Sequence, residues 1–137
     1  MPHDAERVAE VKAWLTKAAN DLRAGGHALR GEPPFTGDAL FHAQQAAEKS
    51  LKGFLTWHDV AFRRSHDLAE IGRQCVEVDD SLADVCRRAN PLSVFAWLFR
   101  YPGDAEEPEP EEVQEPLALA RQVYDAVCAR LPTEVCP

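Results

Sequence analysis

The chain has 137 residues, of which 45% are hydrophobic and 28% charged, a composition typical of a folded globular protein and not of a disordered one. No run of about 18 apolar residues occurs, so we expect no membrane-spanning helix and no membrane partner. The polar, acidic start, MPHDAERVAE, is unlike a signal peptide. We therefore expect a cytoplasmic protein with one domain over residues 1–137 and a core over about 5–131.

The formal net charge of −8 is concentrated in one Pro-rich segment. Residues 104–115 contain seven acids and no base, so the rest of the chain is nearly neutral. A nearly neutral remainder can carry a local basic patch for an anionic partner. We expect residues 102–116 to form an acidic, solvated loop.

A first helix is predicted over residues 5–24 from apolar positions three and four apart: Val8, Val11, Leu15, Ala18 and Leu22. The adjacent Gly25 and Gly26 weaken this pattern, and residues 27–29 form either one more turn or a frayed end. The Pro- and Gly-rich residues 31–37 predict a loop.

The second helix, over residues 38–57, has the strongest helical pattern in the chain. Asp38 is its expected N-cap, with Thr36 as the second candidate. Its inward face is predicted from the same three-and-four spacing: Leu40, Gln44, Ala47, Leu51, Phe54 and His58.

Three further helices complete the pattern. Ser65 is the expected N-cap of a helix over about 66–77, and a fourth helix starts near Leu82 and is interrupted at Pro91. The apolar residues 92–99 are either a short buried helix or an extended segment. A last helix runs from 111, or from nearer 115, to 131, with Val113, Leu117, Ala120, Val123 (or Tyr124) and Val127 inward. The pattern predicts an all-α fold, an up-and-down antiparallel bundle of about five helices.

The cysteines do not form a metal-binding pattern. Cys75, Cys86 and Cys128 occupy apolar helix positions, which predicts buried thiols. Because no close pair of Cys or His ligands occurs, we expect no metal site. The common nucleotide-cofactor, phosphate-loop and hydrolase motifs are also absent, so we expect no cofactor.

A ridge of polar side chains accompanies the apolar face of the second helix: Gln45, Glu48, Lys49 and Lys52. Glu48 and Lys52 are four residues apart, a spacing that favours an ion pair. One interpretation is a solvated face with a single ion pair. The other is a polar interface, in which the Gln amides and Lys49 and Lys52 meet a partner helix or a phosphate.

Two further stretches have the chemistry of an anion site. Arg63 and Arg64 precede a helix start, where free N–H groups add to their charge. His66 has an acid next to it in sequence, and Arg100 and Tyr101 follow the apolar run. Arg100 can bind a phosphate and Tyr101 can hydrogen-bond or stack. Alternatively, His66 only packs against a neighbour, Arg100 pairs with Glu residues, and Tyr101 closes the bundle.

Together these stretches resemble the HEPN domain family over about residues 5–131. The resemblance is carried, in order, by the run QQAAEKSLK at 44–52, by His66-Asp67-Leu68, and by Arg100-Tyr101-Pro102-Gly103. It implies a helical bundle that forms a homodimer. It also implies a partner, since prokaryotic members are often encoded beside a minimal nucleotidyltransferase in what looks like a toxin–antitoxin module.

Many members of the family are metal-independent ribonucleases, with an Arg followed after four to six residues by a His. In this chain none of the histidines follows an Arg at that spacing: His3, His27, His42, His58 and His66. We therefore expect a nucleotide-binding or nucleotidyltransferase-partner protein, with Lys49, Lys52, Arg63, Arg64 and Arg100 as candidate phosphate ligands. A structural dimerisation domain is the first alternative. A homodimeric ribonuclease acting on RNA is the second, with His66, Arg100 and Tyr101 as candidate catalytic residues.

Overall fold

The computed structural model describes residues 4–137, which contain five α-helices, four 3₁₀ helices and no strand. The α-helices are α1 (Ala5–Leu29), α2 (Thr36–Trp57), α3 (Leu68–Val78), α4 (Ala83–Ala89) and α5 (Gln114–Cys128). The 3₁₀ helices are η1 (Asp80–Leu82), η2 (Asn90–Ala96), η3 (Pro110–Glu112) and η4 (Thr133–Val135). The prediction of an all-α bundle of five helices is confirmed.

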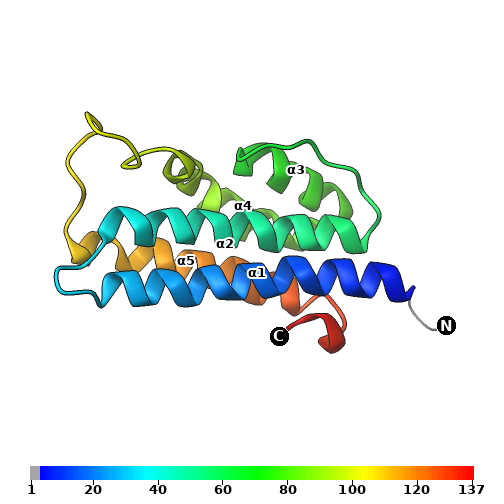
Figure 1. The fold of residues 1–137 in the computed structure, drawn as a ribbon. Coiled ribbons are helices and arrows are strands. Elements are labelled where there is room, and N and C mark those ends of the chain that lie inside the picture. The colour runs from blue at the N-terminus through cyan, green and yellow to red at the C-terminus, as the bar shows by residue number, and fades with distance from the viewer. Residues whose placement is uncertain (1–3) are drawn as a thin grey trace.

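The bundle is organised around α2 (Figure 1). Helices α2 and α5 both run antiparallel to α1 and pack against it, while α3, α4 and η2 cover the opposite side of α2. His3 lies outside the described residues. Within the described part of the chain, no helix is both long and apolar enough to span a membrane.

Helix α1 continues past residue 24 to Leu29, because Gly25 and Gly26 do not end it. Gly25 is buried, and a Cβ atom there would lie 2.8 Å from Leu117 Cδ2 and 3.4 Å from the carbonyl oxygen of Ala39. The missing side chain therefore lets α1 pass close to α2 and α5. Of the two alternatives for residues 27–29, the further helical turn is confirmed, because packing against other helices compensates for the weak helix propensity of glycine.

Helix α2 begins at Thr36, and neither predicted side-chain cap is present. Instead, the backbone N–H of Gly37 donates to Glu107 Oε1 at 2.7 Å. The acidic segment therefore supplies the cap of α2 from far along the sequence, and it is not only a solvated loop. The predicted inward face of α2 is confirmed except for His58, which is exposed and contacts the ring of Phe54.

Helix α3 begins at Leu68, later than predicted, and its N-cap is Asp67 and not Ser65. Asp67 Oδ1 accepts from the N–H of Ala69 at 2.9 Å, and Ser65 Oγ accepts from the N–H of Asp67 at 3.0 Å. Two successive side-chain caps thus compete at this helix start, and the second one marks the boundary. As a result, His66 lies outside the helix.

The remaining boundaries follow from local packing. Residues 92–99 adopt the short-helix alternative over most of their length, as η2. Helix α5 begins at Gln114, close to the later of the two predicted starts, and ends at Cys128, before the predicted residue 131. Its predicted inward residues Val113, Ala120, Val123 and Val127 are fully buried.

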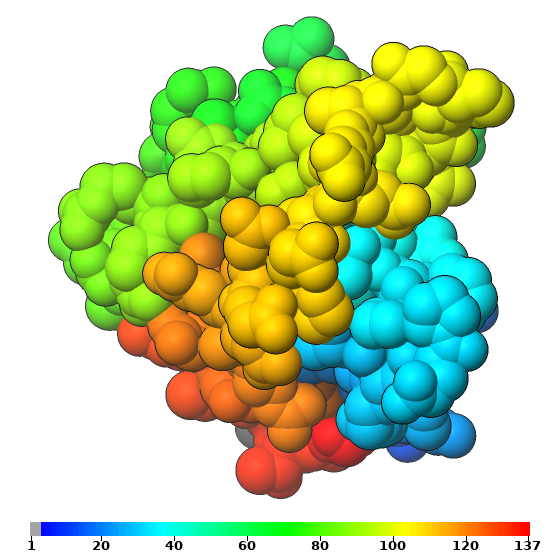
Figure 2. All heavy atoms as spheres, turned by 90° about the vertical axis from the view of Figure 1, so that its left-hand side faces the viewer, coloured from blue at the N-terminus to red at the C-terminus, as the bar shows by residue number. Residues whose placement is uncertain are grey.

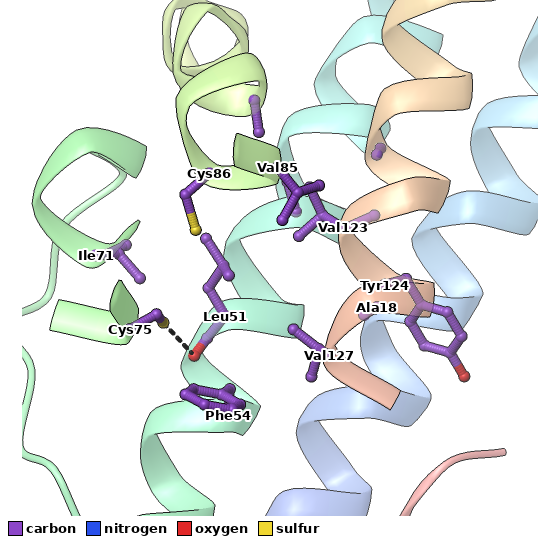
Figure 3. Close-up of a cluster of buried hydrophobic side chains, with 14 of the residues drawn as sticks. Ala18, Leu51, Phe54, Ile71, Cys75, Val85, Cys86, Val123, Tyr124 and Val127 are labelled. Carbon is purple, nitrogen blue, oxygen red and sulfur yellow. Dashed lines mark hydrogen bonds between the residues drawn. The ribbon is translucent and has the colours of Figure 1, made fainter. Parts of the chain in front are cut away.

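The core lies where α2 meets α3, α4 and α5 (Figure 3). Leu51 and Phe54 of α2 are fully buried there, and Cys75 Sγ lies 3.6 Å from the carbonyl oxygen of Leu51. Burial raises the pKa of the Cys75 thiol and raises that of Cys86 to about 11. Both cysteines are therefore inert buried thiols, as predicted.

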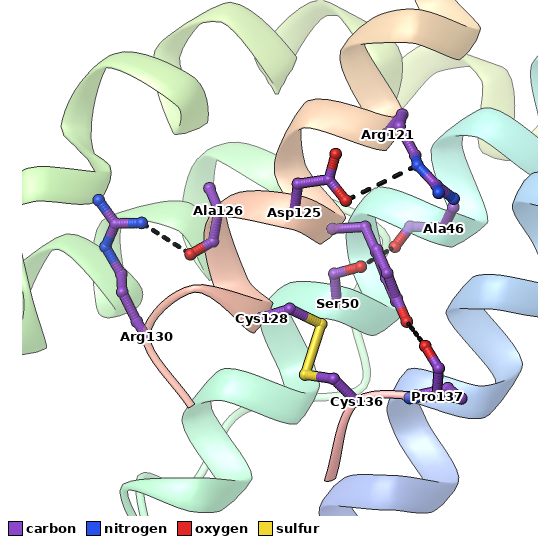
Figure 4. Close-up of a disulfide and its surroundings, with 10 residues drawn as sticks. Ala46, Ser50, Arg121, Asp125, Ala126, Cys128, Arg130, Cys136 and Pro137 are labelled. Carbon is purple, nitrogen blue, oxygen red and sulfur yellow. Dashed lines mark hydrogen bonds and ion pairs between the residues drawn. A yellow bond between two sulfur atoms is a disulfide. The ribbon is translucent and has the colours of Figure 1, made fainter. Parts of the chain in front are cut away.

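Cys128 is not a free thiol, contrary to the prediction, because it forms a disulfide with Cys136 (Figure 4). This bond holds the C-terminal tail against the bundle. Val135 is fully buried, and the Tyr124 hydroxyl donates to the carbonyl oxygen of Pro137 at 3.0 Å. The sequence carries no local signal for the pairing, since the two cysteines meet only after the chain turns back behind α5.

Replacing Cys136 with Ser is expected to lower the free energy of unfolding by about 2–3 kcal/mol, because the disulfide restricts the unfolded chain over a short loop. The measurement is urea unfolding with and without a reductant. Reductant should lower the stability of the wild type to that of Cys136→Ser and leave the variant unchanged. Equal stability of the wild type and Cys136→Ser in the absence of reductant would contradict the prediction.

Candidate functional site

A buried carboxylate, Glu48, is the centre of the polar ridge on α2. Glu48 is 4% exposed and both of its oxygens are used. Oε1 accepts from Gln44 Nε2 at 2.9 Å and lies 2.8 Å from His66 Nδ1, and Oε2 accepts from Lys52 Nζ at 3.0 Å. Because Nδ1 faces Glu48 and the His66 side chain is 66% exposed, the other ring nitrogen, Nε2, is available to a ligand.

The ridge is not a solvated face, because Lys52 is buried as well as Glu48. Lys52 Nζ lies 5.8 Å from the centre of the Trp14 ring and 5.5 Å from that of Phe62, which are cation–π distances. These two rings also contact each other edge to face, so they enclose the ammonium group. Half-buried Gln45 extends the network by donating to the side-chain oxygen of Gln44.

A second polar cluster joins α1 to α2 around Asp21. His42 Nδ1 lies 2.8 Å from Asp21 Oδ1, and Lys49 Nζ donates to Asp21 Oδ2 at 2.6 Å. Burial acts to raise the pKa of Asp21, but the hydrogen bonds from His42 and Lys49 outweigh it and hold the pKa below its ordinary value. Sequence reasoning missed Asp21 and His42, because residues far apart in the chain meet here.

Asp21 predicts a pH-dependent contribution to stability. Its pKa is lower in the folded than in the unfolded chain, so this contribution is complete above about pH 4 and is lost as the pH falls through the folded-state pKa. Asp21→Asn should lower the free energy of unfolding by about 1–3 kcal/mol at pH 7. The difference from wild type should shrink below about pH 4.

Urea unfolding of both proteins between neutral and acidic pH checks this expectation. Asp125→Asn is the matched control, because its partner Arg121 and Asp125 itself are both mostly exposed. A difference between wild type and Asp21→Asn that is the same at every pH would contradict the assigned pKa shift.

The predicted phosphate ligands differ in whether a carboxylate of the chain already pairs with them. Lys49 and Lys52 hold carboxylates within the chain, and the exposed Arg63 pairs with Glu70 at 3.1 Å. Among residues 4–137, Arg64 and Arg100 form no ion pair. These two arginines are therefore the predicted phosphate ligands whose charge is not neutralised by a carboxylate of the described chain.

Arg100 is held by an aromatic ring of α2. Its guanidinium carbon lies 3.8 Å from the centre of the Phe41 ring. The side chains of the nearby acids accept hydrogen bonds from backbone N–H groups instead. Asp104 accepts from the N–H of Tyr101, Glu107 from that of Gly37, and Glu112 from that of Glu109. The alternative in which Arg100 pairs with Glu residues is thus wrong for the described chain. Tyr101 is 69% exposed, so it does not close the bundle either.

His66 and Arg100 lie along the same face of α2 without contacting each other through any hydrogen bond in the described chain. His66 bonds Glu48, whereas Arg100 stacks on Phe41, seven residues earlier on the helix. Seven helical residues span about 10 Å, so the anchoring residues of the two groups lie about two turns apart along one face of α2. No group of three metal-ligating side chains occurs in the described part of the chain.

Residues 11–131 match the HEPN domain family, which covers most of the chain. No curated protein and no solved structure matches the chain. The match spans α2, His66 and Arg100, the three parts of the sequence that carry the candidate site.

Proposed function

The chain belongs to the HEPN domain family, and from this premise we propose that it is a nucleotide-binding protein that works with a minimal nucleotidyltransferase in a toxin–antitoxin-type module. Arg100 carries the proposal. Its guanidinium is stacked on Phe41 and has no carboxylate partner among the described residues, although an acidic segment follows it directly. A positioned arginine without an acid partner is well suited to bind a phosphate.

The rest of the face supports the same chemistry. Arg64 adds a second positive charge in the loop before α3. His66 presents Nε2 to the surface, where it can hydrogen-bond a phosphate or a ribose hydroxyl, and Glu48 fixes the orientation of the ring. The buried Glu48–Lys52 pair anchors His66 to α2, because Glu48 accepts from Lys52 and also contacts the His66 ring.

Calorimetric titration with ATP, AMP and inorganic phosphate tests this function. Arg100→Ala should weaken nucleotide binding roughly tenfold or more, because a hydrogen bond to a charged phosphate is lost. Arg121→Ala is the control: this exposed arginine of α5 pairs with Asp125 (Figure 4) and should leave binding unchanged. Equal binding by Arg100→Ala and wild type would contradict the proposal. A dimer that binds no nucleotide would favour the structural dimerisation domain.

We also propose a homodimer that binds the nucleotidyltransferase encoded beside it. Light scattering should give a mass of about twice the 15.2 kDa of one chain. Co-expression with the product of the neighbouring gene should give a larger complex. A monomer that does not co-purify with that protein would contradict this part of the proposal.

One observation favours a second candidate, a metal-independent ribonuclease. A carboxylate-bound His66 and an Arg100 on the same face supply the two groups that such chemistry needs, an acid–base catalyst and a phosphate ligand. RNA cleavage by the pure protein should then disappear in His66→Ala and in Arg100→Ala, and persist in Arg121→Ala. Cleavage that survives both substitutions would exclude these residues.

A further inference from the structure

Two large aromatic side chains close to Arg100 in sequence are exposed to solvent. Trp97 is 59% exposed and Tyr101 is 69% exposed, whereas most large aromatic side chains of the chain are buried or half-buried. We propose that these two rings stack on the nucleobase of a mononucleotide whose phosphate contacts Arg100. This inference rests on the proposed nucleotide-binding function and extends it from the phosphate to the base.

The backbone explains why both rings face outward. Phe99 has a φ of 68°, a left-handed conformation that is strained for a bulky residue and persists only where the surroundings impose it. Its ring stacks on Phe95 with 6.2 Å between the ring centres and packs against the cluster that contains Leu40 and Val113. Phe99 therefore attaches this segment to the bundle, while Trp97 and Tyr101 on either side of it remain exposed.

Tyr101 is exposed from a closed turn, not from a loose end. The N–H of Asp104 donates to the carbonyl oxygen of Tyr101 at 3.3 Å, and the N–H of Tyr101 donates back to Asp104 Oδ2 at 3.1 Å. Pro102 and Gly103, the latter with a φ of 91°, occupy the central positions that such a turn requires. A ring presented by a closed turn loses less conformational freedom on binding than one on a mobile loop.

The two exposed rings and Arg100 belong to one short segment of the chain. Figure 2 shows the segment around residues 97–104, in yellow, as a lobe that projects above the first turns of α2, in cyan. Arg100 connects the lobe to α2 through its stacking on Phe41. Aromatic rings beside an arginine are the groups that proteins use to stack bases and bind their phosphates.

The negative charge of the residues that follow the lobe affects which nucleotide ligands can bind there. The acids that begin at Asp104 follow the lobe directly, and a field of negative charge disfavours a long polyanionic strand. A mononucleotide carries few charges and requires only one phosphate contact. This charge distribution favours a mononucleotide over an extended RNA at the lobe.

Titration with AMP and with ribose 5-phosphate, which has the phosphate but lacks the base, separates the two contacts. Wild type should bind AMP roughly tenfold more tightly than ribose 5-phosphate, because of base stacking. Trp97→Ala and Tyr101→Ala should lose this preference and still bind ribose 5-phosphate as wild type does. Tyr101→Phe keeps the ring and should keep the preference. Val78→Ala, at an exposed apolar position of α3, is the control and should behave like wild type.

The outcomes distinguish this inference from the proposed function. Equal affinity for AMP and ribose 5-phosphate, unchanged in the aromatic variants, would overturn base stacking and leave phosphate binding intact. Binding of neither compound would overturn both proposals. A short RNA that binds more tightly than AMP, with the same dependence on Trp97 and Tyr101, would overturn the assignment of a mononucleotide.

Discussion

Glu48→Ala should lower the free energy of unfolding by about 3–5 kcal/mol, because it leaves the Lys52 ammonium buried without a counter-ion. Lys52 is 7% exposed and Glu48 is its only ion-pair partner in the described chain. The substitution also removes the acceptor of Gln44 and His66. Urea unfolding followed by circular dichroism measures the loss.

Two comparison variants separate the buried charge from the rest of the effect. The double variant Glu48→Leu, Lys52→Met removes both charges and should recover most of the lost stability, because apolar side chains of similar size replace the pair. Asp125→Asn breaks an ion pair whose members are mostly exposed and should cost less than about 1 kcal/mol. A Glu48→Ala protein as stable as Asp125→Asn would contradict the assignment of a buried ion pair.

Phe54→Ala should lower the free energy of unfolding by a similar amount, about 3–5 kcal/mol, because it opens a cavity in the core. Phe54 is fully buried and is the largest of the completely enclosed side chains. It lies among Leu51, Cys75 and Val127, on three different helices, so few neighbours can move to fill the space (Figure 3). Urea unfolding again provides the measurement.

Phe35→Ala is the matched control for Phe54. It removes the same ring from a position that is 59% exposed, and it should change the stability by less than about 1 kcal/mol. Phe54→Leu keeps most of the volume and should fall between wild type and Phe54→Ala. Equal losses in the Phe35 and Phe54 variants would contradict the position of the core.

Much of the fold could be predicted from the sequence, because helical periodicity is a local property. The inward residues Leu15, Leu51 and Val127 follow from three-and-four spacing alone, and all three are fully buried. The boundaries were less predictable where a helix end depends on another part of the chain. Gly25 stays helical because α2 and α5 pack there, and the N-terminus of α2 is capped by Glu107.

In the candidate site, too, contacts within one helix could be predicted and contacts between elements could not. Glu48 and Lys52 are neighbours on one helix, so their pairing could be predicted, and His66 and Arg100 were selected by their chemistry. Three other contacts could not be predicted, because each joins separate elements of the fold. They are the pairing of His66 with Glu48, the stacking of Arg100 on Phe41 and the contact of Asp21 with His42. The exposure of Trp97, at the end of an apolar run, was equally invisible in the sequence.

The residue pattern is enough to predict a helical bundle of the HEPN type and to identify the helix that carries the polar ridge. Three features follow from the packing of the elements and not from that pattern: the burial of the Glu48–Lys52 pair, the separation of Arg100 from the acids that follow it, and the Cys128–Cys136 disulfide. The physical reason is that burial and charge pairing depend on distances between elements. Helical spacing shows which residues share a face of one helix, but it does not show which residues of other elements lie against that face.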